Sequence, residues 1–496
     1  MNVNQPEMPF GTEFTDKELT DQWESIDWKV VQETVNNLQL RIARAAKDRK
    51  WHRVYKLSRL LTNSYRAKLL AVKTVTSNKG GKTPGIDGVT WKSPADKMRA
   101  VHSLSNKRYH AKPLKRIYIP KKNGKLRPLS IPTLKDRAMQ MLHLLALSPI
   151  EASTGDKSSF GFRKFRSTHD ACKQLFSCLN SKNSSHWILE GDILGCFDNI
   201  SHEWLLNHIP MNKSVLNQFL KAGFVFSDRL FPTNAGTPQG SAISPTLANM
   251  VLNGIQTLLG LKFFSSKKGR IYKSYNIHKI NYVRYADDFV VTADSNEILE
   301  EIKAILTQFL KERGLELSVE KTLITHISEG FDFLSWNFRK YNGKLLVKPS
   351  KESIKRVKIT IRDTFHMAIA WPQDAIITKL NPLIRGWANY HKKVVASVIF
   401  NDLDKYVWDV SWTWAKRRHQ SKPKRWIAKR YWKRVDSRNW VFSGEKQTLV
   451  QFFETKIRYH TPLKLDMNPF IDKVYFEERK GIRKDRSQTR LSQFSC

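Results

Sequence analysis

The segment that decides the fold is Tyr282-Val283-Arg284-Tyr285-Ala286-Asp287-Asp288-Phe289-Val290-Val291. Two adjacent carboxylates separate two runs of β-branched and aromatic residues, which are typical of strands. We therefore predict a β-hairpin with Asp287 and Asp288 at its turn. An acidic pair in a turn is most often simply solvated, but the apolar flanks and the short turn favour a fixed site. Hard divalent cations such as Mg²⁺ prefer carboxylate oxygens.

A second candidate carboxylate, Asp192, lies in the apolar segment 187–193. A buried carboxylate without a partner is costly, so we expect Asp192 to face a cation or a hydrogen-bond donor. Two metal ions about 4 Å apart, held by such carboxylates, can activate an attacking oxygen and stabilise a leaving one. That chemistry is nucleotidyl transfer. Asp198, a little further on, is expected to cap the next helix instead.

A loop rich in glycine and proline, residues 235–243, lies between these two segments and leads into a predicted helix. Its centre is Thr237-Pro238-Gln239-Gly240. Small residues in such a loop allow a base pair or another backbone to approach closely. Most glycine loops are ordinary turns, so this loop indicates a functional site only in combination with the carboxylates.

The surrounding pattern predicts an α+β fold without the regular alternation of a doubly wound parallel sheet. Asn123-Gly124 is a strong hairpin turn, and Thr133 precedes the next helix as an N-cap. Beyond about residue 345 the chain is predicted to be mostly helical and basic. Apolar periodicity predicts helices at 27–76, 244–259 and 296–310, and strands at 114–119, 187–193, 282–292 and 331–338.

The composition limits the class of partner. The chain has 496 residues, with 85 Lys and Arg against 45 Asp and Glu, so its formal net charge is +40. Because 41% of the residues are hydrophobic, the chain can bury real cores and is not a disordered polycation. Such a charge repels itself unless a polyanion neutralises it, which favours nucleic acid. No apolar stretch approaches the roughly 18 residues of a membrane-spanning helix.

The N-terminus has the wrong charge for a targeting peptide. Its first 24 residues contain six acidic side chains and only one basic residue, Lys17. A secretory signal has a basic start before an apolar block, and a transit peptide is rich in Arg and poor in acidic residues. The four cysteines form no CxxC pair, which argues against a disulfide framework or a structural zinc site. We expect a bacterial-type protein of the cytoplasm and nucleoid.

Together these segments resemble the palm of reverse transcriptases, and more narrowly of those encoded by group II introns. The resemblance rests on Y-A-D-D at 285–288, D-I-L-G-C-F at 192–197 and G-T-P-Q-G-S-A-I-S-P-T-L-A-N at 236–249. It covers roughly residues 30 to 480. Further matching motifs, in the order of the family, lie at 83–88, 119–137, 159–171, 317–322 and 331–336.

The resemblance implies a right-hand polymerase, with antiparallel sheet in fingers and palm and a helical thumb, that uses two Mg²⁺ ions. Asp192 and Asp287 would be the main metal ligands, and the backbone carbonyl of Ile193 would complete a coordination shell. Asp288 would assist near the primer end. Lys321 would donate a proton to pyrophosphate, although a lone lysine fits a surface charge equally well.

The resemblance also implies contacts to the incoming deoxynucleotide and to the primer–template. Phe197 would pack under the sugar and exclude a 2′-hydroxyl, although a core aromatic also fits this position. Gln239 would lie by the template–primer, with Tyr285 and Ala286 of the hairpin turn. Basic residues clamp transferring phosphates, and the candidates to hold the triphosphate are Arg116, Lys121, Lys125 and Arg127.

Residues 411–440 form a basic cluster with eleven Lys or Arg, one acidic residue and five Trp. A charge run is usually only a solvated face, but Arg interleaved with Trp suits phosphate contacts and stacking on unpaired RNA bases. Just upstream, 381–391 is expected to form a helical thumb. The arrangement resembles the maturase domain of intron proteins, which binds intron RNA and helps it splice. The RNA contacts expected there are Arg417, Arg418, Lys424, Arg425, Trp426, Lys429 and Arg430.

The resemblance divides the chain into four parts. These are a helical N-terminal extension (1–90), the fingers and palm (91–340), the thumb and maturase domain (341–440), and a basic region that resembles a DNA-binding segment (441–496). Many relatives continue into a zinc-bound HNH endonuclease. We do not expect that domain here, because the sequence stops about where it would open.

The sequence thus predicts an RNA-directed DNA polymerase of a group II intron. It would bind the intron RNA as a ribonucleoprotein, assist splicing, and reverse transcribe the RNA from a primer at a DNA target. One alternative is a reverse transcriptase of another bacterial lineage, against which the Trp-rich basic cluster argues. The other is a non-catalytic RNA-binding splicing factor, against which the three aspartates argue. No membrane partner is expected.

Overall fold

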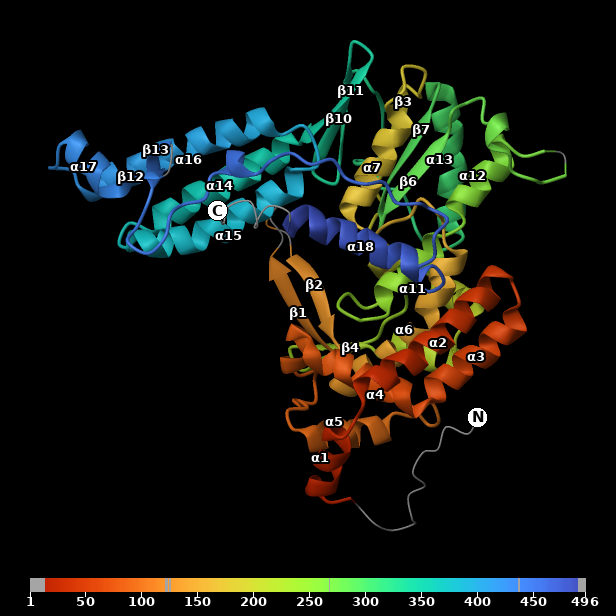
Figure 1. Ribbon diagram of the computed structural model, residues 1–496. Coiled ribbons are helices and arrows are strands. Elements are labelled where there is room, and N and C mark those ends of the chain that lie inside the picture. The colour runs from red at the N-terminus through yellow and green to blue at the C-terminus, as the bar shows by residue number, and fades with distance from the viewer. Residues whose placement is uncertain (1–13, 121–123, 125, 267, 436–437, 489–496) are drawn as a thin grey trace.

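The computed structural model describes residues 14–120, 124, 126–266, 268–435 and 438–488. Figure 1 shows the N-terminal helices at one end of the molecule, a mixed sheet and helix region above them, and a group of helices that projects to one side. The elements at the N-terminal end are α1 (Asp16–Glu24), α2 (Trp28–Lys47), α3 (Trp51–Asn63), α4 (Tyr65–Ser77), η1 (Lys79–Lys82) and α5 (Pro94–Ser103).

The helical prediction for residues 27–76 is confirmed, but as three helices. Asp27 begins α2, because its carboxylate accepts hydrogen bonds from the amides of Lys29 and Val30. The chain breaks at Arg49, which has a positive φ of 56°, and again at Ser64. The three helices α2, α3 and α4 all pack against the long helix α6 (Leu134–Thr154).

The first sheet has the strand order β2-β1-β4-β5. β1 (Leu114–Pro120) and β2 (Leu126–Ile131) form the predicted antiparallel hairpin. β4 (Phe224–Phe226) runs parallel to β1 and pairs with β5 (Arg229–Phe231). Most of the predicted turn lies outside the described residues. After β2, the Thr133 hydroxyl accepts from the Asp136 amide at 3.2 Å, so the predicted N-cap of α6 is confirmed.

The second sheet is antiparallel, in the order β6-β7-β3-β8. Alternate residues of its strands enter two different cores. Leu189 and Val291 pack with α13 (Asn296–Lys311), whereas Ile188 and Val290 pack with α7 (Thr168–Leu179). Both faces are therefore covered (Figure 1). The strands are β3 (Trp187–Gly191), β6 (Asn281–Tyr285), β7 (Asp288–Ala293) and β8 (Leu323–His326).

Short helices connect the strands of this sheet. The predicted helix at 244–259 is interrupted at Gly254, whose φ of 106° ends one helix and starts the next. The connecting elements are α8 (Cys196–Asn199), α9 (His202–His208), α10 (Lys213–Lys221), α11 (Ser244–Leu252), α12 (Ile255–Phe263) and η2 (Lys273–Tyr275).

A third sheet, in the order β11-β10-β9, leads into the projecting helices. The ring of Trp336 stacks on that of Tyr390 at 4.6 Å, which joins this sheet to the helix predicted at 381–391. A β-hairpin within the basic cluster was not predicted. The elements are β9 (Phe331–Phe333), β10 (Trp336–Tyr341), β11 (Lys344–Pro349), α14 (Lys351–Met367), α15 (Gln373–His391), α16 (Ser397–Arg418), α17 (Lys424–Tyr431), β12 (Trp432–Val435) and β13 (Arg438–Phe442). No helix of the described ranges is long and apolar enough to cross a bilayer.

The last described segment returns from these helices to the base of the second sheet, with η3 (Phe452–Glu454) and α18 (Lys473–Gln488) (Figure 1). Its main anchor is Asp170, a buried carboxylate at the start of α7. Asp170 accepts a hydrogen bond from Nε2 of His460 at 2.8 Å and forms an ion pair with Arg479. The C-terminal segment is therefore an integral part of the packed protein.

We predict that Asp170→Asn lowers the free energy of unfolding by about 3 kcal/mol at neutral pH, because it leaves a buried Arg479 without its counter-charge. Burial alone would raise the pKa of Asp170, but hydrogen bonds from His460 and Ser167 and the charge of Arg479 hold it well below its usual range. A depressed pKa stabilises the fold above the unfolded-state value of about 4, and this stabilisation is lost as the pH falls below it.

Thermal unfolding of both proteins between pH 7 and pH 3 checks this prediction. The difference in melting temperature is expected to narrow below about pH 4. A difference that stays constant at every pH would contradict the role of the ionised carboxylate.

Candidate active site

The predicted hairpin is present, and its turn carries the two adjacent carboxylates. β6 ends at Tyr285 and β7 begins at Asp288, and these two residues pair across the turn. Between them, Ala286 has a positive φ of 58°. A non-glycine residue enters this region at some energetic cost, so the surroundings must hold it there.

Arg284 holds the turn from within the protein. Its side chain is completely buried. The guanidinium donates hydrogen bonds to Oδ1 of Asn249 at 3.1 Å, to Oδ1 of Asn253 at 2.9 Å and to the carbonyl of Ala286 at 3.1 Å. A buried cation is tolerated only with such acceptors, so Arg284 ties the hairpin to α11 and to the residue that follows it.

Gly161 packs against the same turn from another segment. Its carbonyl accepts a hydrogen bond from Nδ2 of Asn249 at 2.9 Å. The neighbouring Phe160 amide donates to the carbonyl of Arg284 at 2.8 Å. A Cβ on Gly161 would lie only 2.3 Å from the backbone nitrogen of Ala286. This close approach explains why glycine stands here.

The third carboxylate lies on the neighbouring strand. β3 pairs with β7 so that Gly191 is opposite Phe289, and the next position along the ladder brings Asp192 beside Asp288. Nζ of Lys321 lies 2.7 Å from Oδ2 of Asp192. The structure thus brings together the four residues that the sequence nominated as catalytic, Asp192, Asp287, Asp288 and Lys321.

The electrostatics of this cluster reflect crowded negative charge. Desolvation, together with the charges of Asp287 and Asp192, raises the pKa of Asp288 to about 7, although the side chain reaches solvent. Burial and the charge of Asp192 also raise the pKa of Asp287. The pKa of Lys321 is raised, chiefly by its hydrogen bond to Asp192. Lys321 is therefore protonated at neutral pH.

Carboxylate oxygens gathered in this way fit a hard divalent cation, which would relieve their mutual repulsion. In the part of the chain that the structure describes, no three His, Cys, Asp or Glu side chains form a ready-made metal cage. One oxygen of Asp192 faces the ammonium group of Lys321. The donor types suit Mg²⁺, and part of the negative charge is balanced by a side chain.

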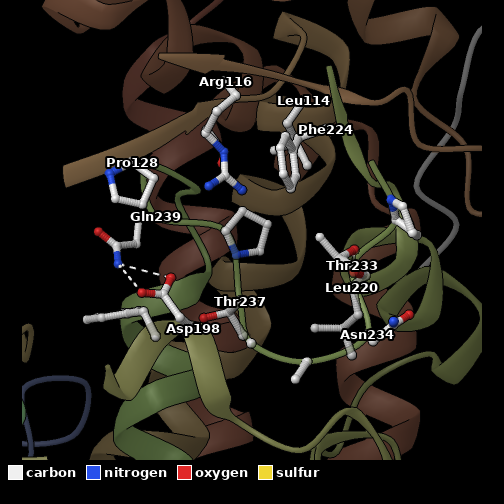
Figure 2. Close-up of a pocket in the computed structure, with 16 residues that line it drawn as sticks. Leu114, Arg116, Pro128, Asp198, Leu220, Phe224, Thr233, Asn234, Thr237 and Gln239 are labelled. Atoms are coloured by element: carbon white, nitrogen blue, oxygen red, sulfur yellow. Dashed lines mark hydrogen bonds between the residues drawn. The ribbon is translucent and has the colours of Figure 1, made fainter. Parts of the chain in front are cut away.

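A pocket of about 290 Å³ lies between the first sheet and the 235–239 loop (Figure 2). Phe197 is half-buried at its wall, and its ring meets that of Phe162 edge to face at 6.3 Å. Gln239 also lines it, and its Oε1 accepts a hydrogen bond from Nε of Arg127 at 2.8 Å. Phe197 thus lines an open pocket as well as packing against the core.

Of the four basic residues nominated for the triphosphate, the two that the structure describes, Arg116 and Arg127, are not brought together. Arg127 is paired with Ile119, whereas Arg116 is paired with Ser130. Since neighbouring residues alternate between the faces of a strand, the two arginines lie on opposite faces of the hairpin. The Arg116 guanidinium lies 3.7 Å from the ring centre of Phe224. The other two, Lys121 and Lys125, lie outside the described residues.

The expected capping role of Asp198 is wrong. The N-cap of α9 is Ser201, whose hydroxyl accepts from the Trp204 amide at 3.2 Å. The carboxylate of Asp198 accepts instead from Nε2 of Gln239, at 3.2 Å to each oxygen. The sequence held no signal for this contact, because an acidic residue a few positions before a helix is also a common capping pattern.

The basic cluster surrounds the end of α16 and α17. Arg418 also has a structural task, because its Nη1 donates to the carbonyls of Ile369 at 3.1 Å and Trp371 at 2.5 Å. The seven residues nominated for RNA contact are all exposed, namely Arg417, Arg418, Lys424, Arg425, Trp426, Lys429 and Arg430.

The interpretation of the interleaved tryptophans as a stacking surface is wrong for two of them. Trp414 and Trp432 are 4% and 5% exposed, and Nε1 of Trp414 donates to the Ala368 carbonyl at 2.9 Å. They form the core of this region. Trp426 and Trp440, which are 37% and 54% exposed, remain available at its surface.

Three family models match successive parts of the chain. Residues 119–338 match the reverse transcriptase (RNA-dependent DNA polymerase) model. Residues 23–104 match the N-terminal domain of reverse transcriptase, and residues 354–432 match the group II intron, maturase-specific domain. With the α+β fold and the carboxylates on adjacent strands, these matches define an RNA-directed DNA polymerase. Enzymes of this class generally use divalent metal ions.

Curated relatives narrow the assignment. The chain is 33% identical to Protein YkfC of Escherichia coli (strain K12), over 66% of this chain and 92% of YkfC. It is 30% identical to the group II intron-encoded protein LtrA of Lactococcus lactis subsp. cremoris, over 65% of this chain and 64% of LtrA. It is 29% identical to the putative COX1/OXI3 intron 1 protein of Saccharomyces cerevisiae (strain ATCC 204508 / S288c), over 65% of this chain and 44% of that protein.

The chain belongs to the group II intron-encoded reverse transcriptases that carry a maturase domain, as the resemblance in the sequence predicted. It spans less than two thirds of the length of LtrA and of the yeast protein.

We predict that Gly161→Ala reduces primer extension by about a hundredfold. The added methyl group would displace the Ala286 turn and with it the carboxylates. Misplacement of catalytic groups by about 1 Å can lower a reaction rate by about a hundredfold. Single-nucleotide incorporation on an RNA template measures the effect.

Gly386 provides a matched control. It lies exposed within α15, and a Cβ there would meet nothing within 4 Å. Gly386→Ala is expected to stabilise the helix by about 1 kcal/mol and to leave extension unchanged. Full activity of Gly161→Ala would contradict the tight packing at the turn.

Proposed function

We propose that this protein copies RNA into DNA by two-metal nucleotidyl transfer. It binds the RNA of a group II intron as a ribonucleoprotein and assists its splicing. It then reverse transcribes this RNA from a primer at a DNA target. The observation that carries the polymerase part is the convergence of Asp192, Asp287 and Asp288 from two adjacent strands. The match of residues 354–432 to the maturase-specific domain supports the RNA part.

In the proposed mechanism, Asp192 and Asp287 would hold two Mg²⁺ ions, with the backbone carbonyl of Ile193 as a further ligand. Bound there, the ions would supply activation of the primer hydroxyl and stabilisation of the leaving oxygen. Asp288 lies at the edge of the site, near the primer end. Lys321 is protonated beside Asp192, so its Nζ can give a proton to the departing pyrophosphate.

The deoxynucleotide is proposed to bind beside the three aspartates, on the face of the β1–β2 hairpin that carries Arg127. Arg127 holds its triphosphate, together with Lys121 and Lys125, and Arg116 faces the adjoining pocket. Phe197 excludes a 2′-hydroxyl under the sugar. Gln239, Tyr285 and Ala286 line the path of the primer–template. These roles follow the family pattern at matching positions, and the half-buried setting of Phe197 supports them.

The RNA is proposed to lie along the exposed basic side chains of the thumb, at the end of α16 and on α17. We also propose the division of the chain into a helical extension (1–90), fingers and palm (91–340), thumb and maturase domain (341–440), and a basic region that contacts target DNA (441–496). The position of α18 supports a DNA contact by region 441–496, because this helix lies between the thumb and α11 (Figure 1).

We predict that Asp287→Ala abolishes Mg²⁺-dependent primer extension, because it removes a metal ligand, while RNA affinity changes by less than about twofold. Extension assays and filter binding of intron RNA measure the two properties separately. Glu301→Ala, an exposed substitution on α13, is the control and should leave both unchanged. Extension by Asp287→Ala at the wild-type rate would overturn the polymerase site.

We predict that RNA affinity falls steeply with salt, because each neutralised phosphate releases counterions. Arg425→Ala combined with Lys429→Ala should reduce the slope of log affinity against log salt by about 1 to 2. Lys303→Ala combined with Lys311→Ala, a pair on α13 far from the cluster, is the matched control. A flat salt dependence, or equal effects of the two pairs, would contradict an electrostatic RNA surface on the thumb.

A further inference from the structure

Gln239 stands at the centre of a hydrogen-bonded chain that joins three segments. Its Oε1 accepts from Nε of Arg127 on β2 at 2.8 Å. Its Nε2 donates to both carboxylate oxygens of Asp198, at 3.2 Å each, as the dashed lines in Figure 2 show. Its backbone carbonyl accepts from the Ser130 amide at 2.7 Å. Gln239 therefore ties the fingers hairpin to the palm through its backbone and its side chain.

Only one orientation of the Gln239 amide satisfies the hydrogen bonds to Arg127 and Asp198. A guanidinium only donates and an ionised carboxylate only accepts, whereas an amide has one end of each kind. Arg127 therefore requires the oxygen of Gln239, and Asp198 requires its nitrogen. If the amide turned over, both ends would face groups of their own kind.

Arg127 meets Gln239 through Nε alone. Within the residues that the structure describes, no hydrogen bond or ion pair occupies its two Nη groups. Arg127 lies on the face of the β1–β2 hairpin opposite Arg116, and its side chain is exposed. The two Nη groups are therefore available to bind a phosphate.

The backbone around Asp198 is also firmly placed. Its amide donates to the carbonyl of Gly195 at 2.8 Å, and the Thr237 amide donates to the carbonyl of Phe197 at 2.6 Å. A Cβ on Gly236 would lie 2.5 Å from the carbonyl oxygen of Asp198. The loop that carries Gln239 therefore packs directly on the short helix that carries Asp198, which keeps the backbone of Asp198 beside Gln239.

We propose that Asp198 is a positioning residue of the polymerase reaction. It orients the amide of Gln239, which in turn holds Arg127 by Nε, so that both Nη groups bind the triphosphate of the incoming deoxynucleotide. This inference rests on the proposed polymerase function and adds to it a residue that contacts neither metal nor nucleotide. Its effect is on nucleotide binding, because the bond-making atoms lie with Asp192 and Asp287.

The test is the steady-state kinetics of single-deoxynucleotide incorporation by the full chain on an RNA template with a DNA primer. Asp198→Ala should raise the KM for the deoxynucleotide about tenfold or more, with kcat changed less than about threefold, because a charge-assisted hydrogen bond is lost. Asp198→Asn keeps an acceptor of the same shape and should stay within about threefold of the wild type. Asp228→Asn, in the exposed turn between β4 and β5, is the control and should change neither constant.

A double-mutant cycle tests the route through Gln239. In a Gln239→Met background the added Asp198→Ala should change KM by less than about twofold, because the amide that it orients is gone. A second measurement requires no turnover and uses a primer that ends in a dideoxynucleotide. It determines the concentration of the next deoxynucleotide that is needed to stabilise the complex of enzyme and primer. Asp198→Ala should raise this concentration by the same factor as KM.

The outcomes separate this inference from the function on which it rests. A wild-type protein that does not extend primers would overturn the polymerase function. A wild type that extends, with an Asp198→Ala variant of unchanged KM and unchanged melting temperature, would overturn the positioning role alone. So would an undiminished effect of Asp198→Ala in the Gln239→Met background.

Discussion

The buried guanidinium of Arg284 is the constraint on which the active site depends. A cation without solvent must have acceptors on several sides, and here they come from Asn249, Asn253 and the Ala286 carbonyl. These acceptors belong to α11, to the residue after it and to the hairpin turn. Satisfying one buried charge therefore fixes the relative position of all three, and it places the turn in a conformation that an isolated hairpin would avoid.

The acidic turn contains like charges that repel one another, because its carboxylates lie close together at the edge of the sheet. Burial, together with the charges of Asp287 and Asp192, raises the pKa of Asp288 to about 7, and the ammonium group of Lys321 offsets part of the charge of Asp192. The protein thus stores negative charge where a divalent cation can relieve it. The net charge of +40 conceals this small acidic centre, since the excess of basic side chains lies elsewhere, in part on the exposed thumb surface.

Much of the fold could be predicted because it is encoded locally. The β6–β7 hairpin, the β1–β2 hairpin and the Thr133 cap follow from periodicity and turn chemistry within a few residues. Asp192 was singled out because a carboxylate in an apolar strand is costly, and Asp287 and Asp288 because their short turn has apolar flanks. The break at Gly254 and the β12–β13 hairpin were missed, since a single glycine or a short basic strand gives little periodic signal.

The sequence by itself determined the family, the strands that carry the carboxylates and the sign of the partner's charge. Only the tertiary structure decided which side chains share a surface. It buries Trp414 and Trp432 while leaving Trp426 exposed, separates Arg116 from Arg127 across a hairpin, and joins Asp198 to Gln239. The physical reason is the distance along the sequence over which each interaction acts. Strand alternation and capping act between neighbours in the chain, whereas burial and hydrogen bonding between distant segments depend on how whole elements pack.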